Sequence, residues 1–294
     1  MKRNCALNFQ FFRIWLVLYK DSFVKDAKEQ KIVVLLSLQA SDKNLILNGI
    51  KVASIFRKEL CLLYNYSKME QTNLENLKLT LNQYIVPILN ELPGLKVTTL
   101  LVSEKLSVLP EKLADDYEAI MFVARFSEFK KYASAIAESS IPFLFVNDKI
   151  DEISTFKKII LPIDLRGGNS ETALWSSYFG RFNQAGIVVV AANDKNKDEH
   201  QQVNKNVYLS KKLFLKFKLE HKIFKGTKSS FRNAFEALEI AHSSQSDLMI
   251  MLGSSSITPL DWIVGLPERK IIENAGNLPV LIVNPRRDNY ILCD

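Results

Sequence analysis

The chain has 294 residues, of which 47% are hydrophobic and 24% are charged, and its formal net charge is +7. These values are ordinary for a globular protein of about two domains. The sequence has no apolar run of about 18 residues or more, so it predicts no membrane span. The three cysteines and three histidines lie far apart and match no metal-binding or redox spacing. We therefore expect a cytoplasmic protein with reduced thiols, no membrane association and no metal site.

Residues 1–30 precede the first regular pattern and combine a basic start with an apolar middle. A secretory signal peptide has this arrangement, but polar residues interrupt the apolar part and no small-residue cleavage site follows. We therefore predict a poorly ordered extension, or a segment that does not belong to the native protein.

Strand and helix patterns alternate along residues 31–148. Short continuous apolar runs predict strands, and longer amphipathic runs predict helices. The predicted strands are residues 31–37, 60–66, 95–102, 118–124 and 140–148. The predicted helices between the first four strands are residues 45–56, about 70–91 and 104–115, and a further helix joins the last two strands.

The same order returns along residues 157–286. Its predicted strands are residues 158–164, 186–193, 221–226, 246–252 and 277–285, and its first three helices are residues 173–182, about 199–219 and 230–242. Equivalent segments are about 127 to 137 residues apart, and the two copies end alike, in SIPFLFVND and NLPVLIVNP. A nearly constant offset over five strands indicates an internal duplication.

Alternating strands and helices predict βαβ units and parallel sheets, and strands that are apolar throughout predict helices on both faces. We therefore predict two doubly wound α/β domains in tandem, at residues 31–148 and 157–286. Only about ten residues join them, so the halves should pack together through a sheet edge or a helix pair. A ligand would bind at the carboxyl ends of the strands, where the strand order reverses.

The second half has the stronger candidate site. Asp164 ends its first strand before a Gly-Gly turn, and Gly253 follows its fourth strand before a hydroxyl-rich loop. In a doubly wound sheet both residues would face one crevice. A carboxylate there can accept hydrogen bonds from an adenine amine or ribose hydroxyls, and a glycine lets a phosphate approach backbone N–H groups.

This arrangement resembles the universal stress protein family, in particular its tandem-domain members, over about residues 31–285. In that family the first strand ends in an apolar-Pro-apolar-Asp pattern, and Leu161 to Asp164 of the second half match it. The resemblance implies Rossmann-like sheets of the adenine nucleotide alpha hydrolase-like type, and a site for ATP or AMP with the loop pattern G-x2-G-x9-G-[ST]. The nucleotide-binding residues that it implies are Pro162, Ile163, Asp164, Gly253, Ser254, Ser255, Ser256 and Gly265.

The loop departs from the family pattern. Ser256 stands where the second glycine belongs, and eight residues instead of nine separate it from Gly265. Leu266 replaces a hydroxyl residue, and Pro267 has no N–H to offer a phosphate. Tight, weak and absent nucleotide binding therefore all stay open. In the first half, Ser37 stands where Asp164 would lie and the loop has no glycine, so we expect that half to serve packing and pairing.

The stretch of residues 205–228 is rich in lysine. It could form a surface for nucleic acid or for an acidic partner, or it could be the solvated face of an amphipathic helix. Leu209, Leu213 and Phe217 recur at helical spacing, which favours the solvated face, and no nucleic-acid-binding motif accompanies the lysines.

We predict a non-catalytic stress-response or regulatory protein with weak ATP or AMP binding in its second half. The alternative is an interaction scaffold that has lost nucleotide binding in both halves, and the third hypothesis is a nucleotide hydrolase. No catalytic base or metal set supports the hydrolase beyond Asp164. Besides the nucleotide, we expect a protein partner or a second copy of the chain, and neither nucleic acid nor membrane.

Overall fold

The structure is a computed structural model that describes residues 29–149, 153–254 and 267–285. Of the predicted extension at residues 1–30, all but the last two residues lie outside the described residues. In the part of the chain that the structure describes, no helix combines the length and the apolar character needed to cross a membrane.

The first half contains five strands and the helices that connect them. The strands are β1 (Lys31–Leu35), β2 (Glu59–Asn65), β3 (Val97–Val102), β4 (Ala119–Arg125) and β5 (Phe143–Val146). The helices are α2 (Asp42–Phe56), α3 (Leu74–Glu91), α4 (Leu109–Tyr117) and α5 (Phe129–Glu138), with 3-10 turns at η2 (Lys68–Asn73) and η3 (Phe126–Glu128).

The second half repeats this order. Its strands are β6 (Lys158–Ile163), β7 (Gly186–Ala191), β8 (His221–Lys225), β9 (Leu248–Leu252) and β10 (Val280–Val283). Its helices are α6 (Asn169–Asn183), α7 (Lys197–Lys216), α8 (Asn233–Ser243) and α10 (Pro267–Asn274). Each of these ten strands overlaps a predicted one. A strand such as β9 is apolar along its whole length because helices cover both faces, whereas the edge strand β8 is mostly exposed.

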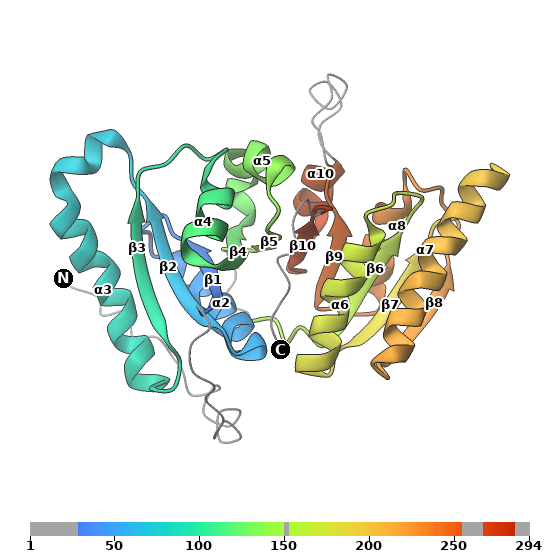
Figure 1. The fold of residues 1–294 in the computed structure, drawn as a ribbon, viewed down its shortest axis with the longest axis horizontal. Helices are drawn as coiled ribbons and strands as arrows, with labels where there is room; N and C mark the ends of the chain where they lie inside the picture. Colours follow the sequence, from blue (N-terminus) through green and yellow to red (C-terminus); the bar gives the residue numbers. More distant parts are fainter. Residues whose placement is uncertain (1–28, 150–152, 255–266, 286–294) are drawn as a thin grey trace.

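The ten strands form a single sheet in the order β3-β2-β1-β4-β5-β10-β9-β6-β7-β8 (Figure 1). Within each half the paired strands are parallel, whereas β5 and β10 pair antiparallel, with Phe145 opposite Val280. Each half is thus doubly wound, and the two last strands join the halves edge to edge. The two segments that end alike in the sequence lie side by side at the centre of the molecule.

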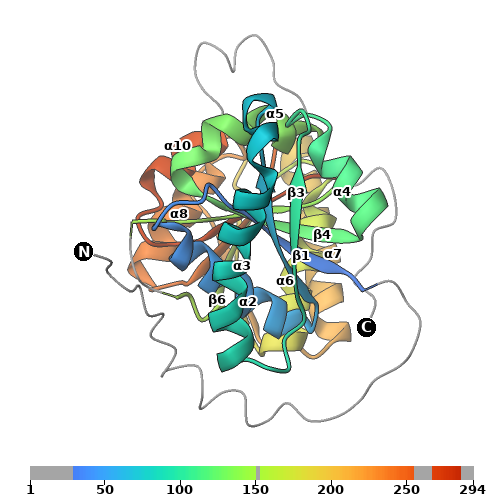
Figure 2. The ribbon, with the colours of Figure 1, turned by 90° about the vertical axis from the view of Figure 1, so that its left-hand side faces the viewer.

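Helices cover both faces of this sheet. The helices α2, α3, α6 and α7 contribute to one apolar core, and α4, α5, α8 and α10 contribute to the other. Figure 2, which views the molecule from the β3 end, shows α3 and α4 on opposite sides of that strand. In β1, Val33 and Val34 are fully buried and point into different cores, since successive side chains of a strand alternate between faces.

A helix pair adds a second contact between the halves. Phe56 at the end of α2 packs against Trp175, Phe179 and Phe182 of α6, with ring centroids 4.9 to 6.1 Å apart. The helix stops there because Arg57 takes the left-handed conformation with a φ of 53°. The halves therefore meet through both a sheet edge and a helix pair.

Two asparagines, one after each last strand, hold the seam reciprocally. Asn147 Nδ2 donates to the Gly276 carbonyl of the second half at 2.8 Å. Asn284 Nδ2 donates to the Ser139 carbonyl of the first half at 3.1 Å, and also to the Ile136 carbonyl at the end of α5. Gly276 and Ser139 each lie eight residues before the asparagine of their own half. The repeated asparagine therefore has a structural role, since antiparallel pairing brings each one to the equivalent turn of the other half.

Candidate functional site

Asp164 lies in the turn between β6 and α6, and amide side chains fix this turn. Asn169, the first residue of α6, donates from Nδ2 to the Asp164 carbonyl and carboxylate, both at 3.0 Å. Asn206 of α7 donates to the carbonyls of Asp164 and Arg166 at 2.8 and 2.9 Å. Asp164 is 6% exposed, so its carboxylate is held in one position at the carboxyl end of β6.

Arg166 bridges the two residues that the sequence placed at one crevice. Its Nε and Nη2 atoms donate to Asp164 Oδ2 at 2.8 and 2.6 Å, and its Nη1 atom lies 3.4 Å from the Gly253 carbonyl. Asp164 and Gly253 therefore lie close together, at the carboxyl ends of β6 and β9. The Arg166 side chain is 43% exposed, so it lies between the buried Asp164 carboxylate and solvent. Arg166 was not among the predicted residues.

The backbone near Gly253 is also engaged by the chain itself. The Ser254 N–H donates to the carboxylate of Glu268, the second residue of α10, which is 3% exposed. Among the described residues, Glu268 Oε2 has no hydrogen-bond partner. A carboxylate thus occupies a backbone donor in the loop that the sequence predicted as a phosphate site. Glu268 was not among the predicted site residues. The signal in the sequence that could have identified it is its position in the first turn of a helix after a glycine-containing loop.

Packing favours glycine at position 253. A Cβ atom there would overlap Asn284 Oδ1 and lie 2.9 Å from Ile282 Cγ2. Pro162 and Ile163 are buried within β6, and the Ile163 carbonyl already accepts from Ala192 and Asn233. The other predicted residues, Ser255, Ser256 and Gly265, lie outside the described residues.

The equivalent strand end of the first half holds an internal ion-pair network. Ser37 stands at the position of Asp164, and its N–H donates to Asp42 Oδ1 at 3.2 Å. Arg125, 2% exposed, pairs with Asp42 and lies 3.5 Å from Glu128. Burial raises the pKa of Asp42, while the charge of Arg125 opposes that shift. Asp42, the carboxylate at this place, is thus engaged by Arg125 and by the backbone of Ser37.

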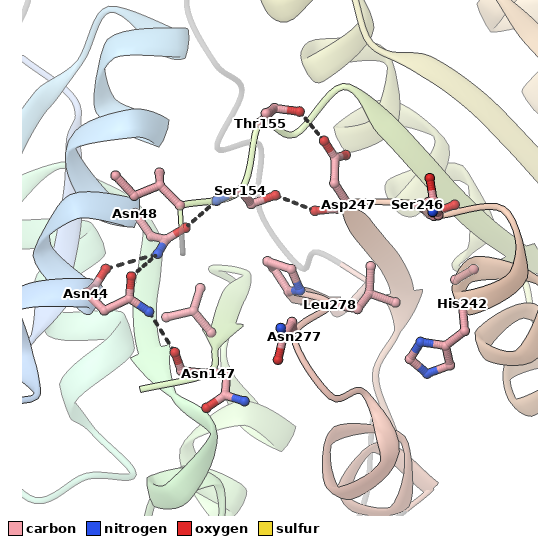
Figure 3. A pocket seen from close by; sticks show the side chains of 15 residues that line it. Asn44, Asn48, Asn147, Ser154, Thr155, His242, Ser246, Asp247, Asn277 and Leu278 are labelled. Atoms are coloured by element: carbon pink, nitrogen blue, oxygen red, sulfur yellow. Dashed lines mark hydrogen bonds between the residues drawn. The ribbon is translucent and has the colours of Figure 1, made fainter. Parts of the chain in front are cut away.

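A cavity of about 260 Å³ lies at the seam, at the carboxyl end of the first-half sheet (Figure 3). Asn44 and Asn48 of α2 line one side, and Asp247 lines the other (Figure 3). Asp247 accepts hydrogen bonds from the backbone N–H groups of Lys157 and Lys158 at 3.0 and 2.7 Å, and from the Thr155 hydroxyl. Asp247 therefore holds the end of the short linker between the halves through these hydrogen bonds. Among the described residues, no group of three or more potential metal ligands occurs.

Comparison with known proteins gives the fold. No family model and no curated protein matches the sequence. A universal stress protein from Archaeoglobus fulgidus DSM 4304 matches with 9% identity and a TM-score of 0.65, over 88% of this chain and 100% of its own. A functionally unknown protein from Pseudomonas aeruginosa PAO1 matches with 11% identity and a TM-score of 0.56, over 87% of this chain and 93% of its own.

A third match, a universal stress protein in complex with cAMP, is 13% identical and covers 44% of this chain and 97% of its own, with a TM-score of 0.33. The first match extends over both halves of the sheet. The chain therefore has the universal stress protein fold in a two-copy arrangement, as its motifs predicted.

Proposed function

We propose that the protein is a non-catalytic regulator of the universal stress protein type whose second half binds an adenine nucleotide weakly. The observation that carries this proposal is the bridge that Arg166 makes between Asp164 and Gly253. A buried carboxylate at a sheet switch point is a partner for an adenine amine or for ribose hydroxyls. Here it is within reach, because the group that covers it is a partly exposed side chain.

Arg166 can be displaced only by a group that takes over its hydrogen bonds. Its side chain is 43% exposed and can move into solvent, but the Asp164 carboxylate is buried and would be left unpaired if nothing replaced the guanidinium. A ligand that donates hydrogen bonds to Asp164 could therefore replace the guanidinium. The freed Arg166 would then be available to a phosphate, with which arginine forms strong bidentate hydrogen bonds.

Glu268 opposes phosphate binding. Its buried carboxylate accepts the Ser254 N–H at the start of the loop, so an incoming phosphate would compete with a negative charge for the same donor. We therefore propose weak binding, in which Glu268 lowers the affinity for ATP more than the affinity for AMP or adenosine.

Calorimetric titration with ATP, AMP and adenosine tests the proposal. We expect millimolar affinity for the native chain and a loss of about tenfold or more, or about 1.4 kcal/mol, in Asp164→Ala. Glu268→Gln should tighten ATP by about threefold to tenfold, since it removes a like charge, and should leave adenosine within about twofold. Asp116→Ala, at an exposed aspartate of the first half, is the matched control. No binding of any of the three ligands at millimolar concentration would overturn the proposal.

The scaffold is the second candidate function, and the ion-pair network of the first half favours it there. Arg125 pairs with Asp42 and lies 3.5 Å from Glu128, so charged side chains of the chain itself occupy the position that corresponds to Asp164. If calorimetry finds no nucleotide, the scaffold is the function that the remaining observations support. A hydrolase would instead release phosphate from ATP above background, and this turnover would disappear in Asp164→Ala.

A further inference from the structure

The positive charge of the chain is concentrated on one end of the sheet. Residues 205–228 contain eight lysines and one glutamate, a balance of +7 that equals the formal net charge of the whole chain. All eight lysines are exposed, and among the described residues none lies within salt-bridge distance of a carboxylate. We call these lysines, on α7, on β8 and in the turns that flank β8, the basic surface. They are Lys205, Lys211, Lys212, Lys216, Lys218, Lys222, Lys225 and Lys228.

Large apolar side chains are exposed on the same elements. Of the twelve exposed large hydrophobic residues in the described part of the chain, six lie between positions 208 and 231. They are Tyr208, Leu209, Leu215, Ile223, Phe224 and Phe231. Leu209 was expected on the packed stripe of the helix but is 47% exposed, because the buried stripe of α7 runs through Val203 and Phe214. A solvated helix face accounts for the lysines but not for these apolar side chains.

The duplication provides an internal reference for this surface. The segment from the start of α3 to the end of β3, residues 74–102, has two lysines and two glutamates, a net charge of zero. The corresponding segment from α7 to β8, residues 197–225, has eight lysines and three carboxylates, a net charge of +5. Both segments form the same part of the same fold, so the fold itself does not require the basic surface.

The outer side of β8 has unpaired backbone groups. β8 is the last strand of the sheet. The Glu220 carbonyl accepts from Ile187 at 3.0 Å, and the Gly226 N–H donates to Ala191 at 2.8 Å, so the even-numbered residues bond to β7. By the alternation of a parallel ladder, the N–H and C=O groups of Ile223 point away from the sheet. Among the described residues nothing pairs with this edge, which is a template for another strand.

We propose that the β8 edge and the basic surface bind an acidic, extended polypeptide segment of another protein, which adds to the sheet as an outer strand. Lysines on an edge strand repel a second copy of the same edge, so the charge selects an acidic partner over self-pairing. Backbone hydrogen bonds to β8 would give affinity, and exposed Ile223 and Phe224 would contact alternate side chains of the added strand. Nucleic acid fits less well, since residues 205–228 contain no arginine and expose aliphatic side chains.

The test uses the full chain and a fluorescein-labelled decapeptide of alternating Glu and Val, followed by fluorescence anisotropy at low and high salt. We expect binding that weakens with salt and falls by about tenfold or more in Lys222→Glu/Lys225→Glu. The matched control, Lys78→Glu/Lys105→Glu, reverses two exposed lysines of the first half and should change affinity by less than about twofold.

A second pair of variants separates strand addition from simple charge attraction. Ile223→Pro removes an outward N–H that an added strand needs, at an edge position where proline is tolerated, and should weaken binding by about tenfold. Ile223→Ala keeps that N–H and should cost less than about threefold, with circular dichroism verifying the fold of both. If Ile223→Pro fails to fold, the two lysine double variants decide. Absent peptide binding, equal loss in both double variants, native-like binding by folded Ile223→Pro, or tighter binding of a single-stranded DNA decamer would each overturn the proposal.

Discussion

The reciprocal asparagines at the seam should differ in what they contribute to stability. Asn284 is 7% exposed and donates to two carbonyls, those of Ile136 and Ser139, whose residues are also buried. Asn147 is half-buried and donates to one carbonyl, that of Gly276, which lies in an exposed turn. The fold is the same at both places, so the comparison tests the combined effect of burial and of the second hydrogen bond.

The expected magnitudes follow from what each substitution leaves unpaired. A buried polar group without a partner costs about 1 to 3 kcal/mol. Asn284→Ala leaves two buried carbonyls without this donor, so we expect a loss of about 2 to 4 kcal/mol in the free energy of unfolding. Asn147→Ala exposes one carbonyl to water, which can replace the amide, so we expect a loss of about 1 kcal/mol or less.

Urea unfolding followed by circular dichroism measures both losses. Asn82→Ala, at an exposed asparagine of α3, is the control and should stay within about 0.5 kcal/mol of the native chain. A lower dependence on urea, or a second transition, would show that the halves separate before they unfold. Equal losses for Asn147→Ala and Asn284→Ala, or a loss below about 0.5 kcal/mol for Asn284→Ala, would refute the reasoning.

Three further predictions concern the seam and the second half. Phe56→Ala should cost about 3 to 5 kcal/mol in urea unfolding, since the ring is 3% exposed and contacts α6; a loss below about 1 kcal/mol would contradict this. Asp247→Ala leaves the exposed N–H groups of Lys157 and Lys158 to water, so it should cost about 1 kcal/mol or less and speed proteolysis of the linker; unchanged cleavage would contradict the role of Asp247 in holding the linker. Burial by itself would raise the pKa of Glu236, but hydrogen bonds from Thr227 and from the N–H of Lys228 outweigh it and lower the pKa below its ordinary 4.5. Because its pKa is lower in the folded state, the ionised Glu236 carboxylate stabilises the fold at pH values above the ordinary pKa. This contribution to the free energy of unfolding is lost as the pH falls through the folded-state pKa, and Glu236→Gln should remove it. Parallel plots of unfolding free energy against pH for the two proteins, from about pH 7 to pH 3, would disprove the prediction.

The sequence was sufficient for the strands and their repetition. A strand such as β1 is apolar along its whole length because helices cover both faces, and that cause is visible in a few consecutive residues. It was less informative about the lysine-rich helix. Leu209 recurs at helical spacing with Leu213, yet it is 47% exposed, because helical spacing identifies a stripe without showing which side faces the sheet.

The candidate site was predicted only in part. Asp164 and Gly253 follow the strands that flank the switch point, so their proximity could be inferred from strand order. Arg166 and Glu268 could not be assigned in this way, since each acts through a partner that the fold brings near. From the sequence alone, the Asp164 carboxylate and the Ser254 N–H would be expected to be free for a ligand. In the structure Arg166 binds the first and Glu268 binds the second.

The sequence by itself determined that the chain is two copies of one α/β unit, because periodic apolar patterns are local and the offset between them is nearly constant. Only the tertiary structure decided that the copies share one sheet, with β5 antiparallel to β10. The physical reason is that strands pair through backbone N–H and C=O groups, and every residue except proline has both. The side chains therefore do not show which strand edges pair. Asn147 and Asn284 marked the place in the sequence, but the carbonyls that they bind belong to the backbone of the other half.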